Sequence, residues 1–290
     1  MNVKKGLKTL YRLVPFKKTL FSILKKIWVP PFHRHLHFKG LINVRVSEHE
    51  SFKIHHHGYE LENEIFWKGI TGWEKMSTNV WIQLCRNSNS VMDIGANTGV
   101  YSLIAKAVNP LAKVYAFEPV TRVFKKLALN SEVNGYDIVC SEYAVSNFNG
   151  EAIIYDTDDE HIYSVTVNKN RALTHAQAIQ KKIRTITLKE FIEQNKIQHI
   201  DLMKIDVETH EPEVLEGFDR YLQLFRPTIL IEVLDDEVGA KVESIVRDKG
   251  YLYFNIDERS GIRKVDTITQ SAFFNYLLCN ESVASSLRLI

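Results

Sequence analysis

The chain has 290 residues and is 45% hydrophobic, so it is long enough for one large domain or two small ones with a substantial core. Its 37 basic and 35 acidic residues give a formal net charge of +2, which argues against a nucleic-acid-binding protein with a basic core. The three cysteines lie far apart without a CxxC pair, which excludes a disulfide framework and the usual metal-ligand spacing.

Residues 1–39 form a basic amino-terminal arm, and residues 1–47 contain no acidic residue. Apolar residues recur in the arm at helical spacing, first as Leu7, Leu10, Tyr11 and Val14, then as Leu20, Ile23, Leu24 and Ile27. Such a segment can lie on an anionic membrane surface, pack on its own domain or fray in solution, and all three alternatives stay open for residues 1–30. The arm lacks the long uncharged run of a signal peptide or membrane span, so we expect a cytoplasmic protein, either free or peripheral at the inner membrane surface.

Residues 40–90 are expected to form a cap segment in front of the main domain. Strand-like stretches at 42–46 and 52–54 precede a helix over Glu74–Leu84. The run His55, His56 and His57 looks like a metal cluster, but neighbouring residues of a strand point to opposite faces. We therefore expect an exposed polar strand end rather than a metal site.

The most informative stretch is Val91–Val100, where an apolar strand ends in Asp93, turns through Gly95 and Gly99, and enters a helix. A second strand, 113–117, ends in Glu118, whose carboxylate can accept hydrogen bonds from both hydroxyls of a ribose. The carboxyl ends of adjacent parallel strands form the usual ligand crevice of an open α/β sheet. This pattern predicts a nucleoside site.

The same residues distinguish between nucleoside cofactors. Asn97 stands where the dinucleotide fingerprint has its middle glycine, and Asp93 would repel a diphosphate. Asp93 instead suits the amino group of S-adenosylmethionine, whose carboxylate would face the N–H groups between Gly95 and Gly99. The alternative is that the glycines only form a tight turn. We expect S-adenosylmethionine as the cofactor, bound by Asp93, Gly95, Ala96, Asn97, Gly99 and Glu118.

From residue 90 onward, strands alternate with helical patterns. Seven strands are expected, at about 91–95, 113–118, 138–144, 200–206, 228–233, 251–256 and 272–278. Alternation predicts a doubly wound, mostly parallel α/β sheet over residues 91–280, and the short connection between the last two strands makes the last one antiparallel. The polar stretch 157–183 is expected at the active-site rim, with Tyr163–Asn168 lining the acceptor pocket, and residues 281–290 form a tail.

A second cluster follows the strand that ends in Asp206. If the chain stays extended, Asp206, Glu208 and His210 point to one side, where His210 or Asp206 can act as general base toward an attacking hydroxyl. The alternative for Glu208 and Glu211 is a structural one, because acids favour a helix start. Glu232 ends the next strand and could join Asp206 in binding Mg²⁺, so metal dependence stays open.

These motifs resemble the FkbM-type family of S-adenosylmethionine-dependent methyltransferases. The matching pieces, which span about residues 91–280, are Asp93–Gly99, Phe117–Pro119, Asn130–Asn134, Lys204–Glu208 and Val214–Gly217. Thr209 stands where the family pattern often has glycine.

The resemblance implies a Rossmann-like class I methyltransferase fold. It also implies O-methylation of a hydroxyl on a sugar, glycan or secondary metabolite, with Asp206, Glu208 and His210 facing the acceptor. The alternatives are an N-methyltransferase and a non-catalytic donor-binding module tethered by the arm, and a nicotinamide oxidoreductase is disfavoured by Asn97. No nucleic-acid partner is expected.

Overall fold

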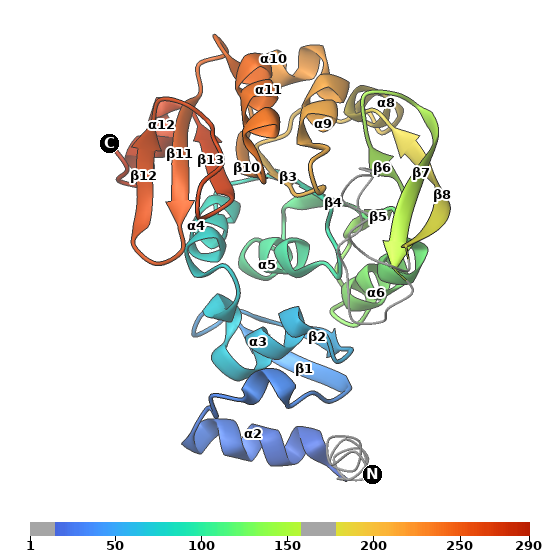
Figure 1. The fold of residues 1–290 in the computed structure, drawn as a ribbon, viewed down its shortest axis with the longest axis vertical. Helices are drawn as coiled ribbons and strands as arrows, with labels where there is room; N and C mark the ends of the chain where they lie inside the picture. The colour runs from blue at the N-terminus through green and yellow to red at the C-terminus, as the bar shows by residue number, and fades with distance from the viewer. Residues whose placement is uncertain (1–14, 158–177) are drawn as a thin grey trace.

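The structure is a computed structural model that describes residues 15–157 and 178–290 (Figure 1). An arm helix lies at one end of the molecule, a small cap follows it, and a large α/β domain forms the other end. None of the helices in the described ranges combines the length and the apolar character needed to cross a bilayer.

The arm and cap contain a short antiparallel hairpin among helices. Their elements are α2 (Lys17–Ile27), η1 (His33–His35), β1 (Gly40–Arg45), β2 (Ser51–His56), α3 (Glu60–Lys68), η2 (Ile70–Gly72) and α4 (Lys75–Cys85). Strand β2 alternates as predicted, because His56 is buried while the rings of His55 and His57 stack on each other with centroids 5.9 Å apart. The three imidazoles therefore do not converge. The expectation of an exposed strand end was wrong for His56, which packs between Phe38 and Phe66 of the cap.

The main sheet has eight strands in the order β12-β11-β13-β10-β9-β3-β4-β5. Their bounds are β3 (Ser90–Ile94), β4 (Lys113–Phe117), β5 (Val139–Ser141), β9 (Leu202–Ile205), β10 (Thr228–Glu232), β11 (Leu252–Asp257), β12 (Gly261–Val265) and β13 (Asn275–Cys279). Strands β10, β9, β3, β4 and β5 are parallel, and β13 runs antiparallel to β10 and β11. The mostly parallel sheet with an antiparallel last strand is confirmed, but the expected number of seven missed the polar edge strand β12.

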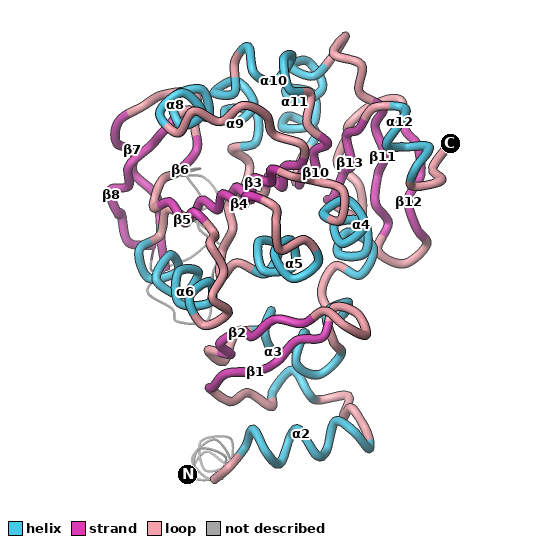
Figure 2. The backbone as a smooth tube through the Cα atoms, turned by 180° about the vertical axis from the view of Figure 1, so that it is seen from behind, coloured by secondary structure: helices cyan, strands magenta, loops and turns pink. Residues whose placement is uncertain are grey.

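Helices cover both faces of this sheet (Figure 2). On the face toward the cap lie α4, α5 (Val100–Val108) and α6 (Thr121–Glu132), and on the other lie α8 (Leu188–Gln194), α9 (Glu211–Phe218), α10 (Arg220–Phe225) and α11 (Asp236–Val246). The expected tail contains α12 (Glu281–Ser286). Every residue of β3 and β9 is buried, so polar side chains within these strands need partners inside the protein.

A second, three-stranded sheet lies beside β5. It has the order β6-β8-β7, with β6 (Ala144–Val145), β7 (Gly150–Thr157) and β8 (Ala178–Ile186). The strand expected at 138–144 is therefore divided between two sheets, and β8 takes up the end of the polar stretch 157–183. The residues Tyr163–Asn168, which we expected in the acceptor pocket, lie outside the described residues.

Candidate active site

A cavity of about 510 Å³ lies at the carboxyl ends of β3, β4, β9 and β10, within the size range of small-molecule sites. All the predicted site residues line it except Gly99: Asp93, Gly95, Ala96, Asn97, Glu118, Asp206, Glu208 and His210. The cap supplies the opposite wall, including Tyr59, Ile65, Trp73 and Glu74. The sequence analysis expected residues 40–90 to shape the pocket but did not indicate which of them do so, because that depends on how the segment folds over the sheet.

The glycine turn is built for packing within the protein. Gly95 has φ +81°, and a Cβ there would lie 1.8 Å from the carbonyl oxygen of Asp206. Gly99 has φ +93°, and its Cβ would lie 2.6 Å from Leu127 Cδ1. Glycine is required at both positions, because the backbone has a positive φ and a neighbouring atom leaves no room for a Cβ. Both glycines are therefore needed to form the turn itself.

The N–H groups of this turn are bonded inside the protein. Those of Gly95 and Ala96 donate to Phe117 O, that of Gly99 donates to Ala96 O, and those of residues 97 and 98 donate to side chains. The expectation that these groups face the carboxylate of a ligand is therefore not met by this geometry. What the turn offers the cavity is the surface of residues 95–97.

Glu118 is held by the backbone at the end of β4. Its Oε2 accepts from Asn97 N at 3.1 Å and its Oε1 from Val120 N at 2.9 Å. The side chain is buried apart from the part that lines the cavity. Each carboxylate oxygen can accept more than one hydrogen bond, so Glu118 can still receive two ribose hydroxyls.

Asp93 and Lys204 lie side by side on β3 and β9, because these strands pair in that register. Asp93 Oδ2 accepts from the N–H and hydroxyl of Ser102 at 2.9 and 2.6 Å, and burial raises the pKa of Asp93 to about 6. Lys204 Nζ donates to Asp206 Oδ2 at 2.8 Å. Burial alone would lower the pKa of Lys204, but the carboxylates of Asp206 and Glu74 raise it above its ordinary value.

The sequence analysis did not predict three residues of this polar cluster, which are Glu74, Tyr101 and Lys204. Tyr101 donates to Glu74 Oε2 at 2.6 Å, and the ammonium of Lys204 lies 4.8 Å from the centre of the Tyr101 ring. Lysine within the strand Leu202–Ile205 was the available signal, since a buried charge requires a partner. Glu74 gave no such signal because it comes from the cap.

The loop after β9 differs from the extended chain that we expected. Glu208 and Thr209 have φ +56° and +79°, which is unusual for residues other than glycine and especially for a β-branched one. The buried Glu211 fixes the loop by accepting from Val207 N and Thr209 N at 3.0 and 3.3 Å. Its role is structural, and burial raises its pKa to about 8.

His210 reaches the cavity from the start of α9. Its Nε2 lies 3.0 Å from Ser146 Oγ and its Nδ1 lies 3.4 Å from Glu213 Oε2. Burial lowers its pKa, although Glu213 acts in the opposite direction. Nε2 therefore has a hydrogen-bond partner, whereas Nδ1 only lies near Glu213, whose Oε2 makes no hydrogen bond in the described part of the chain.

Glu232 ends β10 beside Asp206. Burial and then the Asp206 carboxylate raise the pKa of Glu232 to about 10, so this carboxyl is protonated at neutral pH. Within residues 15–157 and 178–290, no group of three or more His, Cys, Asp or Glu side chains has an arrangement that could hold a metal ion. In this range the pair Asp206–Glu232 has no third ligand of these types.

The lining suits a cationic nucleoside cofactor. Seven acidic residues line the cavity, of which Glu232 is protonated at neutral pH, and Lys204 is the single lysine or arginine among the described lining residues. S-adenosylmethionine carries positive charge on its sulfonium and ammonium groups, and Asp93 can pair with the ammonium. Near Glu118, the apolar side chains of Phe117, Val120 and Ile183 offer a surface for a base. The residues present therefore fit this cofactor.

Comparison with known proteins leads to the same cofactor. The family described as Methyltransferase FkbM domain matches residues 93–253, more than half of the chain. Methyltransferase sdnD of Sordaria araneosa is 27% identical over 188 residues, covering 56% of this chain and 73% of that protein. Hexuronic acid methyltransferase AglP of Haloferax volcanii is 28% identical over 131 residues, covering 45% of this chain and 50% of that protein. The chain thus matches about half the length of AglP.

Among solved structures, Methyltransferase FkbM from Methylobacillus flagellatus KT aligns with a TM-score of 0.41 and 13% identity, covering 66% of this chain and 43% of that one. The extent of the family match, together with the cavity at the carboxyl ends of β3 and β4, decides the identity. The chain belongs to the FkbM methyltransferase family and is an S-adenosylmethionine-dependent methyltransferase.

Proposed function

We propose that the chain is an O-methyltransferase acting on a hydroxyl of a sugar, glycan or secondary metabolite. Asp206 carries this proposal. Its Oδ2 accepts from Lys204, while its Oδ1 has no hydrogen-bond partner in the described part of the chain, and the residue lines the cavity. A hydroxyl must lose its proton as it attacks, and a carboxylate within reach can accept that proton.

The other residues of the loop assist this step. Because Nε2 of His210 is hydrogen-bonded to Ser146 and burial lowers the pKa of the ring, we assign the base to Asp206 and the positioning of the acceptor to His210. Glu208 lines the same wall and is the second acid available to acceptor hydroxyls. When bound, S-adenosylmethionine supplies the methyl group, Glu118 orients its ribose and Asp93 its amino group. Trp73 and Tyr59 of the cap limit the access of water.

The relatives support a sugar acceptor, since AglP is named for a hexuronic acid. The test is transfer of labelled methyl groups to a panel of neutral sugars, hexuronic acids and amino sugars. We expect Asp206→Asn to lower kcat by about 10²–10⁴-fold, the usual contribution of a general base, with the donor Kd within about twofold of wild type. Asp219→Asn, at a surface acid that pairs with Lys189, is the matched control and should leave kcat unchanged.

Two results would contradict this proposal. Methylation of amino sugars alone, with kcat reduced less than about threefold by both Asp206→Asn and His210→Asn, would indicate an N-methyltransferase, for which a base matters less. Tight donor binding without transfer to any acceptor would indicate a non-catalytic module.

A further inference from the structure

Helix α2 exposes a continuous apolar stripe at the end of the molecule farthest from the main sheet (Figure 1). Phe16, Leu20, Ile23 and Ile27 are 83%, 51%, 56% and 80% exposed. Their spacing of four, three and four residues places them on one face of the helix. Exposed apolar side chains in a contiguous patch mark an interaction site.

The stripe is separate from the face by which α2 packs on the cap. Phe21 is buried, with its ring 5.5 Å from that of Trp67 and 6.2 Å from that of Phe38. On the same side, Lys25 Nζ donates to the carbonyl of Phe66. The helix therefore has two apolar faces, and the cap covers one of them.

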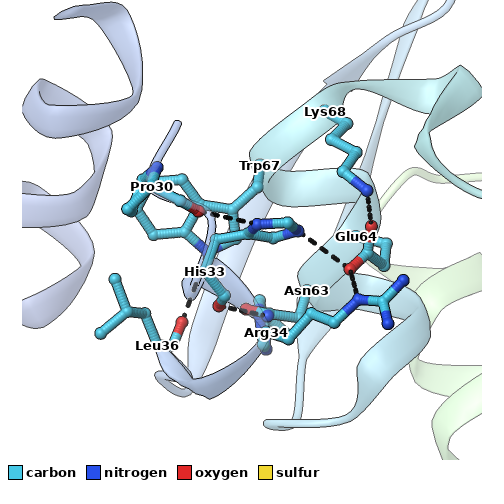
Figure 3. Close-up of polar contacts among 9 residues, drawn as sticks. Pro30, His33, Arg34, Leu36, Asn63, Glu64, Trp67 and Lys68 are labelled. Atoms are coloured by element: carbon cyan, nitrogen blue, oxygen red, sulfur yellow. Dashed lines mark hydrogen bonds and ion pairs between the residues drawn. The ribbon is translucent and has the colours of Figure 1, made fainter. Parts of the chain in front are cut away.

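The chain after α2 holds this arrangement in place (Figure 3). His33 Nδ1 lies 2.9 Å from Pro30 O, and its Nε2 lies 3.0 Å from Glu64 Oε1. The buried Glu64 also pairs with Arg34 at 3.2 Å and Lys68 at 2.5 Å. Because this cluster joins the arm to α3, it fixes the direction of the stripe and of Trp28, Val29 and Phe32, which extend the exposed apolar surface.

The charge around the stripe is of one sign. Residues 15–47 contain seven lysines and arginines and no acidic residue. A groove of about 870 Å³ beside the stripe is lined by Lys17, Lys18, Arg34 and Lys39, with three histidines. Tyr59 and Glu60 line both this groove and the active-site cavity, so the groove leads toward the site of methyl transfer.

We propose that residues 16–32 and the adjoining basic groove, lined by Lys17, Lys18, Arg34 and Lys39, form a docking surface for an anionic lipid bilayer. The helix lies in the plane of the membrane, the stripe enters the boundary of headgroups and acyl chains, and the lysines contact lipid phosphates. A second copy of the chain is a poorer occupant, because it would bring two predominantly basic surfaces together. This docking surface is proposed from the arm and the groove alone, so it holds whichever acceptor receives the methyl group.

The test is co-sedimentation of the full chain with vesicles of phosphatidylcholine alone or mixed with phosphatidylglycerol, at 0.15 M salt. We expect binding to the mixed vesicles and at least tenfold weaker binding to the neutral ones. The double variant Ile23→Glu/Ile27→Glu should reduce binding at least tenfold. Lys17→Gln/Lys26→Gln should reduce it about 25-fold, since each lysine near the surface contributes about fivefold.

The matched control is Leu111→Glu/Leu224→Glu, which places two acids at exposed leucines of the main domain and should bind like wild type. Donor affinity reports the folding of every variant. Equal binding to both vesicle types, no binding by wild type, or unchanged binding by the isoleucine variant would overturn the proposal. A dimer in light scattering that the isoleucine variant disrupts, without vesicle binding by wild type, would show that the stripe contacts a second copy.

Discussion

Asp93 shows how one residue combines a structural and a binding role. Its side chain is 1% exposed, and the Ser102 hydrogen bonds fix one of its oxygens. Burial raises its pKa to about 6 even though Ser102 and Lys204 oppose that shift. The ionised form is therefore costly in the free protein, and a cationic group of the donor offsets that cost.

We expect donor affinity to depend on pH through Asp93. As the pH falls below about 6, Asp93 takes up a proton and the ammonium of the donor loses its partner. At pH 5 the donor Kd should rise by up to about tenfold relative to pH 7, following the fraction ionised. Calorimetric titration between pH 5 and 8 measures this. Asp93→Asn should bind weakly with a flat pH profile, whereas Asp219→Asn should keep the wild-type profile.

The raised pKa of Asp93 affects the stability of the ligand-free protein in the opposite direction, because stability decreases with pH where donor affinity increases. Because the folded pKa lies above the ordinary value of 3.8, the folded state binds more protons between about pH 4 and 6. The contribution of Asp93 to unfolding free energy therefore falls as the pH rises through this window, and Asp93→Asn should remove that fall. A donor Kd that stays constant from pH 5 to 8 would contradict the assigned role of Asp93.

At the scale of elements, strands that are buried on both faces were predictable. The expected ranges 91–95, 113–118 and 228–233 correspond to β3, β4 and β10 within one residue, because uninterrupted apolar runs bounded by turn residues admit few alternatives. Strands β8 and β12 carry charged residues such as Lys181, Lys182 and Lys264, so they lacked that signal. Their pairing depends on distant parts of the chain.

The residues of the candidate site also divide into those that the sequence predicted and those that it did not. Acids at the ends of β3, β4 and β9 could be predicted from the sequence, since parallel strands bring their carboxyl ends to one edge. The cap wall and Glu74 could not, because they depend on contacts between residues far apart in sequence. The loop at Glu208 and Thr209 was wrongly expected to be extended, since Glu211 bends it.

Helix α6 joins the cap to the glycine turn through Asn130. The buried side chain donates to Thr98 O at 2.9 Å and accepts from His55 N at 2.9 Å. Asn134, one turn later, makes two further bonds to the backbone of Lys53 at 2.7 Å. These bonds give a structural role to the region Asn130–Asn134, which is one of the pieces that match the family pattern.

We expect Asn130→Ala to lower the unfolding free energy by about 2–3 kcal/mol, because it leaves a buried N–H and a buried carbonyl without partners. Denaturant unfolding measures this, and the donor Kd should rise as the turn loosens. Asn147→Ala, which removes an exposed bond to Glu216, is the control and should cost less than about 0.5 kcal/mol. Equal effects of the two substitutions would show that Asn130 does not connect the cap to the turn.

At the scale of the molecule, arm, cap and main domain share one apolar core. Phe21, Trp67, Trp81, Leu103 and Leu277 belong to the same buried cluster. The connection to α2 is narrow, however, because Phe21 is the only fully buried side chain within Lys17–Ile27. Local unfolding takes place where few buried contacts hold an element.

We therefore expect Phe21→Ala to detach α2 from the cap, without unfolding the rest and without releasing the chain after α2, which His33 and Arg34 hold to Glu64. The substitution lowers the free energy that holds α2 to the cap by about 3–5 kcal/mol, and the contacts of the half-buried Leu24 and Lys25 are too few to compensate. Trypsin cleavage at Lys17–Lys26 should accelerate at least tenfold, while the donor Kd stays constant because α2 does not line the active-site cavity. Leu20→Ala, on the exposed stripe, should change cleavage less than twofold. If Phe21→Ala instead lowers the melting temperature of the whole protein and weakens donor binding, the arm is an integral part of the core, and its stripe cannot move independently of the active site.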